Sequence, residues 1–343
     1  MLFLRRLAVV SLSLVAVMIL GLSQGGPQGG LALASPPAGT TLNAGNMWLD
    51  GPGDLFLDGQ GVDVISNDFS TTVSRGESYV TVDNVPIYVG EKWQCVELAQ
   101  RLYTTRGWHK GSFPVKSAKE IFAAAPALNF EAHPNNGDYA PVPGDLVVHD
   151  GGTGDPDGHV AVVDHVFPSN GGDFRVAEQN ITDSTNGQQS GTARYHVDSK
   201  GIISRDPSNP AGSLGTILGI VHAPLNLRVS MNSTFTTGPD GSTKDSFRRG
   251  EMIDFRYNVV SSYKVPVSAQ FRVTAWGRQS KDTIFDNSFT APIDAGNPHW
   301  TYVPFYTPTP IPADTKSTAY VLQVSVTVNG QTTRGEHDFY VTP

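Results

Sequence analysis

The spacing of hydrophobic residues divides the chain into two unlike regions. Beyond Pro224, apolar and polar residues alternate in runs that are separated by Gly, Pro and Asn. A period of two is typical of strands with one buried face, so about seven such segments predict an all-β, immunoglobulin-like sandwich, without its disulfide, over residues 224–343. The apolar positions of the clearest runs are Ile253, Phe255, Tyr257 and Val259; Val265, Val267, Ala269, Phe271, Val273 and Ala275; and Tyr320, Leu322, Val324, Val326 and Val328.

The region before this sandwich mixes helical and strand periods. A helical repeat runs from Trp93 to Arg106, where Gly107 favours a stop. A second, shorter helix is predicted between Ser117 and Pro126. The apolar face of the first helix consists of Cys95, Leu98, Ala99 and Leu102.

Strands follow these helices. Pro143 and Gly144 form a turn before a buried strand, and a polar Asp- and Gly-rich loop, residues 150–158, leads to another strand that begins at His159. A third run, from Phe174 to Asn180, also has a period of two. Helices followed by strands predict an α+β domain.

The N-terminus has the pattern of an export signal. Arg5 and Arg6 precede an apolar run from Leu7 to Leu22, and small residues follow up to Ala34. This order predicts a cleavable signal peptide over residues 1–34. The apolar run is short for a membrane span and is followed by Gly and Pro, which disfavours an uncleaved anchor. We therefore expect a secreted, cell-envelope-associated protein with no membrane span after cleavage.

The remaining segments complete the predicted layout. Residues 35–60 are rich in Gly, Pro and Asn and have no lasting periodicity, so we expect a flexible leader. Residues 61–223 form the predicted α+β domain, and residues 224–343 form the sandwich.

The net charge of the chain disfavours two classes of binding partner. The formal net charge is −8, and removal of the two arginines with the signal peptide takes it to −10. Nucleic acids and anionic membranes need a cationic face, so neither is expected as the main partner. The sequence predicts no oligomeric state.

Cys95 is the only cysteine in the chain and cannot form an internal disulfide. It falls in the first turn of the predicted helix, where unpaired backbone N–H groups carry partial positive charge. These groups stabilise a thiolate and can donate hydrogen bonds to a developing oxyanion. The alternative is a small apolar residue that begins a buried stripe, because free cysteines are among the most buried residues.

Two further candidates lie on the predicted strands. His159 follows a glycine-rich loop at the mouth of a strand, a place where an imidazole is held by the sheet but open to a cleft. Alternation places Glu178 and Asn180 on the apolar face of the next strand, where either could accept a hydrogen bond from an imidazole N–H. A structural histidine and an exposed strand end are the alternatives. His165 lies six residues beyond His159, roughly 20 Å along a strand, and is expected at the surface.

Taken together, these motifs resemble a known family. The segments Trp93–Glu97, Gly158–Ala161 and Ala177–Asn180 are similar to those of the cysteine, histidine-dependent amidohydrolase/peptidase (CHAP) family. This resemblance implies a papain-like cysteine hydrolase domain, in which N-terminal helices pack on an antiparallel sheet. Within this family, the chain resembles in particular the amidase domain of glutathionylspermidine synthetase/amidase. The likeness covers roughly half of the chain and lacks the ATP-dependent synthetase half.

The resemblance implies a role for each motif. Cys95 would be the nucleophile, His159 the general base and then acid, and Glu178 the group that orients His159. Asn180 matches a polar position beside the histidine, and Gln94 with the backbone amide of Cys95 would form the oxyanion site. Such an enzyme needs no cofactor.

A metal site is also considered, since some relatives bind calcium. The loop that contains Asp150, Asp155 and Asp157 does not have the spacing of an EF-hand, and a proline interrupts it. An ordinary solvated turn is the favoured interpretation, with no metal.

The function expected from the sequence is a secreted cysteine amidase or endopeptidase that acts through an acyl-thioester on peptidoglycan peptides or another extracellular amide. One alternative is a non-catalytic cell-surface binding or adhesion protein, with Trp276, Trp300, Tyr302 and Tyr306 as candidate surface aromatics, although such residues are more often in a core. The other alternative is an amide acyltransferase, because an amine can also capture an acyl-thioester.

Overall fold

The computed structural model describes residues 37–43, 62–68, 75–153, 155–167, 172–181, 191–208, 214–263, 265–294, 301–302 and 305–343. The predicted signal peptide, residues 1–34, lies outside the described residues. None of the helices in these ranges has the length and hydropathy needed to cross a bilayer.

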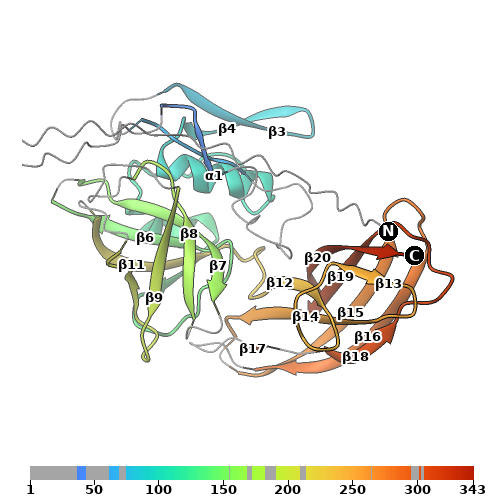
Figure 1. Cartoon of the computed structure of the whole chain (residues 1–343). Helices are drawn as coiled ribbons and strands as arrows, with labels where there is room; N and C mark the ends of the chain where they lie inside the picture. The colour runs from blue at the N-terminus through green and yellow to red at the C-terminus, as the bar shows by residue number, and fades with distance from the viewer. Residues whose placement is uncertain are drawn as a thin grey trace, which may run out of the picture. The chain divides into compact units, whose positions relative to one another are not determined.

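The larger sheet of the first region is antiparallel and, in the described chain, has seven strands in the order β10-β9-β8-β7-β6-β11-β5 (Figure 1). The central strands β6 and β7 are almost fully buried, which explains their near-continuous apolar sequence. The strands are β5 (Glu131–Pro134), β6 (Leu146–Gly151), β7 (His159–Phe167), β8 (Asp173–Ala177), β9 (Thr192–Val197), β10 (Ile203–Arg205) and β11 (Leu214–His222).

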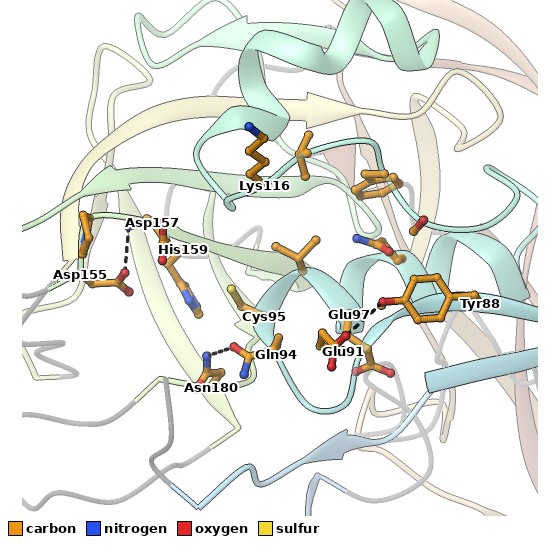
Figure 2. Close-up of a pocket in the computed structure, with 18 residues that line it drawn as sticks. Tyr88, Glu91, Gln94, Cys95, Glu97, Lys116, Asp155, Asp157, His159 and Asn180 are labelled. Carbon is orange, nitrogen blue, oxygen red and sulfur yellow. Dashed lines mark hydrogen bonds between the residues drawn. The ribbon is translucent and has the colours of Figure 1, made fainter. Parts of the chain in front are cut away.

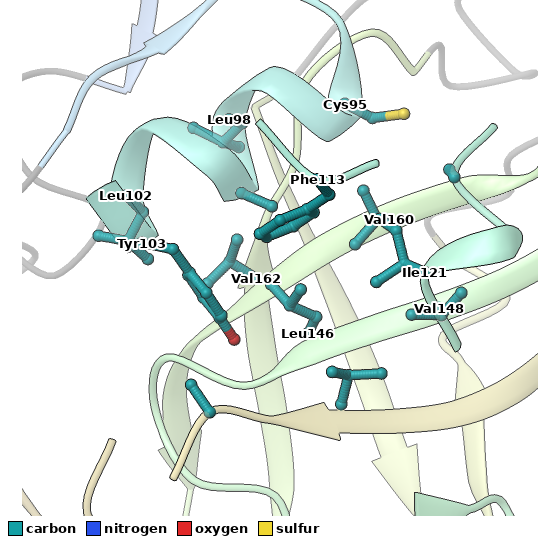
Figure 3. Close-up of a cluster of buried hydrophobic side chains, with 14 of the residues drawn as sticks. Cys95, Leu98, Leu102, Tyr103, Phe113, Ile121, Leu146, Val148, Val160 and Val162 are labelled. Atoms are coloured by element: carbon teal, nitrogen blue, oxygen red, sulfur yellow. The ribbon is translucent and has the colours of Figure 1, made fainter. Parts of the chain in front are cut away.

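The longest helix among the described residues packs on this sheet. Helix α1 (Cys95–Thr105) lies between the sheet and a hairpin of β3 (Glu77–Val82) and β4 (Val85–Glu91) (Figure 1). Its apolar face meets side chains of β6 and β7 in one hydrophobic cluster (Figure 3). Full burial of a leucine such as Leu98 or Leu102 contributes roughly 1.5–3 kcal/mol, so this face fixes the position of the helix on the sheet.

The shorter helical segment differs in form from the expectation. It consists of α2 (Glu120–Ala124) followed by a 3₁₀ turn, η1 (Ala125–Leu128). Pro126 falls at the start of this turn, where the lack of an N–H group is tolerated. The prediction of two N-terminal helices against an antiparallel sheet is therefore confirmed, although the second one is only five residues long before the turn.

Part of the predicted leader pairs with this region. Strand β1 (Thr41–Asn43) pairs with β2 (Val64–Ile65), and Leu42 packs against the hydrophobic cluster under α1. No sequence pattern predicts this pairing, because three residues are too few to show a period. Residues 44–61 lie outside the described residues.

The described residues of the C-terminal region form strands and no helix. Two sheets, β12-β14-β17 with β18 also on β14, and β13-β20-β19-β15-β16, share one hydrophobic cluster. The region is β-rich as predicted, while its immunoglobulin-like topology stays a prediction. The strands are β12 (Val229–Thr237), β13 (Ser246–Arg248), β14 (Met252–Ser261), β15 (Val267–Gly277), β16 (Thr283–Ile293), β17 (Thr301–Tyr302), β18 (Phe305–Pro310), β19 (Ala319–Val328) and β20 (Gln331–Thr342).

The alternating residues behave as the period of two predicts, with one exception. The apolar positions of β14 and β19 named above are all buried in the cluster. The prediction that Val265 lies on the buried face of a strand is wrong, because Val265 precedes β15 and is 63% exposed. Of the candidate surface aromatics, Trp276 is half-buried. Trp300 and the side chains of Tyr302 and Tyr306 lie outside what the structure describes.

Candidate active site

Cys95 is the first residue of α1. Gln94, the N-cap, has an extended backbone with φ −76° and ψ 157°, and Trp93 before it has a positive φ of 66°. This tight turn brings the thiol to the exposed end of the hydrophobic cluster, so Cys95 is 8% exposed yet lines a groove of about 460 Å³ (Figures 2 and 3). Both sequence interpretations therefore hold in part, because the residue begins an apolar stripe and also faces a groove.

His159 is the first residue of β7, as predicted, and its ring lies beside the Cys95 sulfur (Figure 2). Gly158 makes this entry possible. It has a φ of 73°, and a Cβ there would lie 2.5 Å from the backbone oxygen of His149. The imidazole is only 1% exposed.

Glu178 lies behind the imidazole. Its Oε2 is 3.5 Å from Nε2 of His159, which is an ion-pair distance longer than an ordinary hydrogen bond, and the carboxylate is as buried as the ring. The sequence predicts that the strand continues through Glu178. Strand β8 instead ends at Ala177, so Glu178 lies just after the strand and does not continue its alternation. The structure therefore brings Cys95, His159 and Glu178 together in the predicted order.

The partners of His159 determine its charge. Burial disfavours an imidazolium, but hydrogen bonding and charge from Cys95 and Glu178 outweigh burial and raise the pKa of His159 from 6.5 to about 9. At neutral pH the ring is therefore an imidazolium that can donate a proton.

Glu178 owes its charge to an arginine. Burial would raise its pKa, but the charge and hydrogen bonds of Arg205, with a smaller effect of His159, lower the pKa of Glu178 to about 2. The guanidinium of Arg205 donates to both carboxylate oxygens, at 2.8 Å to Oε2 and 2.7 Å to Oε1. Such a two-point contact fixes the orientation of the carboxylate as well as its charge.

A second histidine lies opposite the first. His149 on β6 is the register partner of His159, with ring centroids 6.3 Å apart. Its Nε2 is 2.7 Å from the hydroxyl of Tyr195, and its Nδ1 is 3.3 Å from the carbonyl of Gly215. Burial and the nearby charge of His159 lower the pKa of His149 to about 4, so it is neutral at physiological pH.

Gln94 and Asn180 lie together on the other side of the thiol (Figure 2). Asn180 has a positive φ of 60°, and its Nδ2 donates to Oε1 of Gln94 at 2.5 Å. Its Oδ1 accepts a hydrogen bond from Asn67. The structure thus places Asn180 against Gln94, whereas the family resemblance had implied a position beside the histidine. With its oxygen occupied, the Gln94 amide has N–H groups left to donate.

A buried polar network holds this side of the groove. Glu97 on α1 is 1% exposed and accepts hydrogen bonds from Ser78 at 2.7 Å, Arg101 at 2.7 Å and Gln179 at 2.8 Å. Gln179 also donates to the backbone oxygen of Gln94 at 3.1 Å. The network ties the N-terminus of α1 to the loop after β8, so the thiol and Glu178 keep a fixed separation.

The other candidates do not contact the three proposed catalytic groups. His165 lies farther along β7, half-buried, and its ring contacts Phe167. Asp155 and Asp157 lie at the rim of the groove on the His159 side (Figure 2). Within the described residues, no three His, Cys, Asp or Glu side chains come together in a way that would hold a metal ion.

Sequence reasoning missed three residues of the site, Arg205, Tyr195 and His149. A histidine at the end of the apolar run Leu146–Val148 was a usable signal, because buried polar groups need partners. Arg205 gave none, since its strand is three residues long and distant in sequence from every motif.

Comparisons with known proteins agree with the motifs. Residues 86–180 match the model of the CHAP domain. The bifunctional glutathionylspermidine synthetase/amidase of Escherichia coli (strain K12) is 35% identical over 106 residues, as is that of Shigella flexneri. The match covers 28% of this chain and spans only 16% of the length of either relative.

Solved structures give weaker likenesses. The C-terminal domain of wzt is 13% identical with a TM-score of 0.26, and the match covers 34% of this chain and 74% of that one. The structure of Ly7917 is 14% identical with a TM-score of 0.18, and the match covers 66% of this chain and 69% of that one.

The segment that matches the CHAP family model, residues 86–180, contains Cys95, His159 and Glu178. This segment is therefore a CHAP domain, with distant similarity to the amidase region of glutathionylspermidine synthetase/amidase.

Proposed function

We propose that the protein is a cysteine-dependent amidohydrolase or peptidase, with Cys95 as nucleophile, His159 as general base and acid, and Glu178 as the residue that orients His159. One observation carries the proposal: a thiol at a helix N-terminus and an imidazolium line one groove, and a buried carboxylate lies behind the imidazolium. Each group favours the charged form of the next, which is the requirement for a reactive thiolate at neutral pH.

The first half of the reaction forms an acyl-thioester. The Cys95 thiolate attacks the carbonyl carbon of the amide, and the carbonyl oxygen becomes an oxyanion. The backbone N–H of Cys95 and the side-chain N–H of Gln94 are the proposed donors to that oxyanion, and Asn180 holds Gln94 in place. His159 then gives its proton to the amine nitrogen as the C–N bond breaks.

The second half releases the acyl group. Water attacks the thioester carbon and gives its proton to His159, the C–S bond breaks, and a carboxylic acid leaves. Cys95 returns to the thiolate and His159 to the imidazolium. Glu178 stays ionised throughout and stabilises the imidazolium without taking its proton.

The proposed substrate is an amide of peptidoglycan peptides or another polar extracellular amide. The groove is lined by side chains of both charges, Lys116 on one side and Glu91, Asp155 and Asp157 around it, which suits a charged peptide better than an apolar amide. The predicted signal peptide, residues 1–34, supports an encounter with the substrate outside the cell.

The test is digestion of purified peptidoglycan by the protein and by its Cys95→Ala variant, with mass spectrometry of the released fragments. We expect new free carboxyl and amino termini with the native protein and none with Cys95→Ala. Binding to the wall with no released product, unchanged after alkylation of Cys95, would favour an adhesion protein. Added amines that appear in the product would indicate acyl transfer instead of hydrolysis.

A further inference from the structure

The geometry behind Glu178 points to a role for Arg205, which lies outside the matched CHAP segment. We infer that Arg205, seated against Tyr195, is a positioning residue that keeps the Glu178 carboxylate ionised and aimed at Nε2 of His159. The inference rests on the proposed function, because it assigns the residue that makes the proposed triad work. It extends the site from the three family motifs to the short strand β10.

The first support is the two-point contact. Both terminal nitrogens of Arg205 reach Glu178, one at each carboxylate oxygen, at 2.8 Å and 2.7 Å. A carboxylate bonded in this way cannot rotate, so Oε2 stays directed at His159. A lysine in this place would offer a point charge without the planar fork.

The second support is burial. The side chain of Glu178 is 1% exposed and that of Arg205 is 14% exposed, so water compensates little for either charge. A buried carboxylate that loses its cationic partner takes up a proton instead of remaining charged. Arg205 therefore decides whether Glu178 is a carboxylate at the pH where His159 must be an imidazolium.

The third support is the set of contacts that hold the Arg205 side chain in place. It pairs in register with Tyr195 on β9, donates to the Tyr195 hydroxyl at 3.2 Å, and lies over the ring with its guanidinium carbon 5.7 Å from the ring centroid. Because the guanidinium can only donate, the Tyr195 hydroxyl accepts from it and gives its own hydrogen to Nε2 of His149.

This direction of donation fixes the state of His149. With Nε2 accepting, the ring carries its proton on Nδ1, which points to the carbonyl of Gly215 at 3.3 Å. A neutral His149 adds no positive charge beside His159. Around Glu178, the ionisable groups are thus His159 from β7, Arg205 from β10, Tyr195 from β9 and His149 from β6.

The test needs no substrate, because Cys95 is the only cysteine and its alkylation can be followed by intact mass spectrometry. Rates with iodoacetamide between pH 4 and pH 9 report the thiolate paired with His159. In Arg205→Leu, Glu178 takes up a proton as the pH falls and no longer stabilises the imidazolium. We expect alkylation at pH 5.5 to slow at least tenfold and the profile to move to higher pH by about one unit or more.

The matched control is Arg194→Leu, which removes an arginine of β9 that pairs with Asp173. Its alkylation profile should coincide with that of the native protein. Arg205→Lys keeps the charge and should fall between the native protein and Arg205→Leu. If Arg205→Leu does not fold, as judged by circular dichroism, Arg205→Lys decides the question, and a native profile for it overturns the inference.

A purely structural role is separated by a double-mutant cycle with Glu178→Gln. If Arg205 acts through the carboxylate, then Arg205→Leu should change the alkylation rate less than twofold in the Glu178→Gln background. Equal effects in both backgrounds, or a folded Arg205→Leu with the native profile, would overturn the inference. Shifted alkylation in a protein that hydrolyses no peptidoglycan would leave the role of Arg205 intact and overturn the proposed substrate alone.

Discussion

His149 and His159 lie opposite each other on paired strands, yet one ring is neutral and the other is positively charged. Both are 1% exposed, and their rings are 6.3 Å apart. Yet the pKa of His159 is raised to about 9 and that of His149 is lowered to about 4. Depth of burial therefore does not explain the difference.

The difference comes from what surrounds each ring. His159 faces a thiol and a carboxylate, both of which favour the imidazolium. His149 faces a hydroxyl and a backbone carbonyl, which are neutral, and it also feels the charge of its neighbour. One sheet thus provides a charged imidazole for proton transfer and a neutral one that helps to seat Arg205 through Tyr195.

The largest effect is expected when the charged ring, His159, is replaced. His159→Gln removes the proton donor and should lower kcat/KM by about 10³-fold, within the range for general acid–base catalysis. His149→Gln, its matched control on the paired strand, should lower it less than tenfold. Hydrolysis kinetics on soluble peptidoglycan fragments measure both, and similar losses would show that the two rings do not differ in role.

The next effect concerns the carboxylate that makes the rings differ. The native activity should fall as pH rises through about 9, because His159 then loses its proton. Glu178→Gln removes a group that raises the pKa of His159, so the alkaline limit should move to lower pH and kcat should fall about 10²-fold. A pH–rate profile with an unmoved alkaline limit would contradict this role for Glu178.

The smallest effect lies in the C-terminal sheets. The ion pair between Arg272 and Asp286 joins paired strands, with the arginine 61% exposed. Solvent screens such a pair, so Arg272→Leu should leave the midpoint of urea denaturation almost unchanged. Hydrolysis should be unchanged. Urea denaturation and the same kinetic assay check the two statements, and a large loss in either would show a role for this sheet that the ion pair does not explain.

The two regions also differ in how far the sequence predicts them. In the C-terminal region the period of two is enough to predict which residues are buried, because alternation is a local property of each strand. Tyr257 and Val324 are examples, since both lie in the hydrophobic cluster. The prediction for Val265 was wrong because this residue lies before the first residue of β15, where the alternation of the strand does not apply.

In the CHAP domain the motifs predicted Cys95, His159 and Glu178 to lie together, and the geometry agrees. Their roles remain the proposal made above. Arg205 could not be predicted, because its contact with Glu178 joins residues 27 apart in sequence through a sheet whose strand order is not a local property. The partner of Asn180 was missed for a related reason. A positive φ turns its side chain toward Gln94, and no period reveals such a turn.

The charge of His159 is the central claim, and NMR titration of the histidine ring carbons measures it most directly. Assignment would come from His159→Gln and His149→Gln. The account predicts that the His159 resonance titrates near pH 9 and that of His149 near pH 4. A His159 resonance that titrates at or below pH 6.5 would mean a neutral ring beside Cys95 at physiological pH, and would contradict the account.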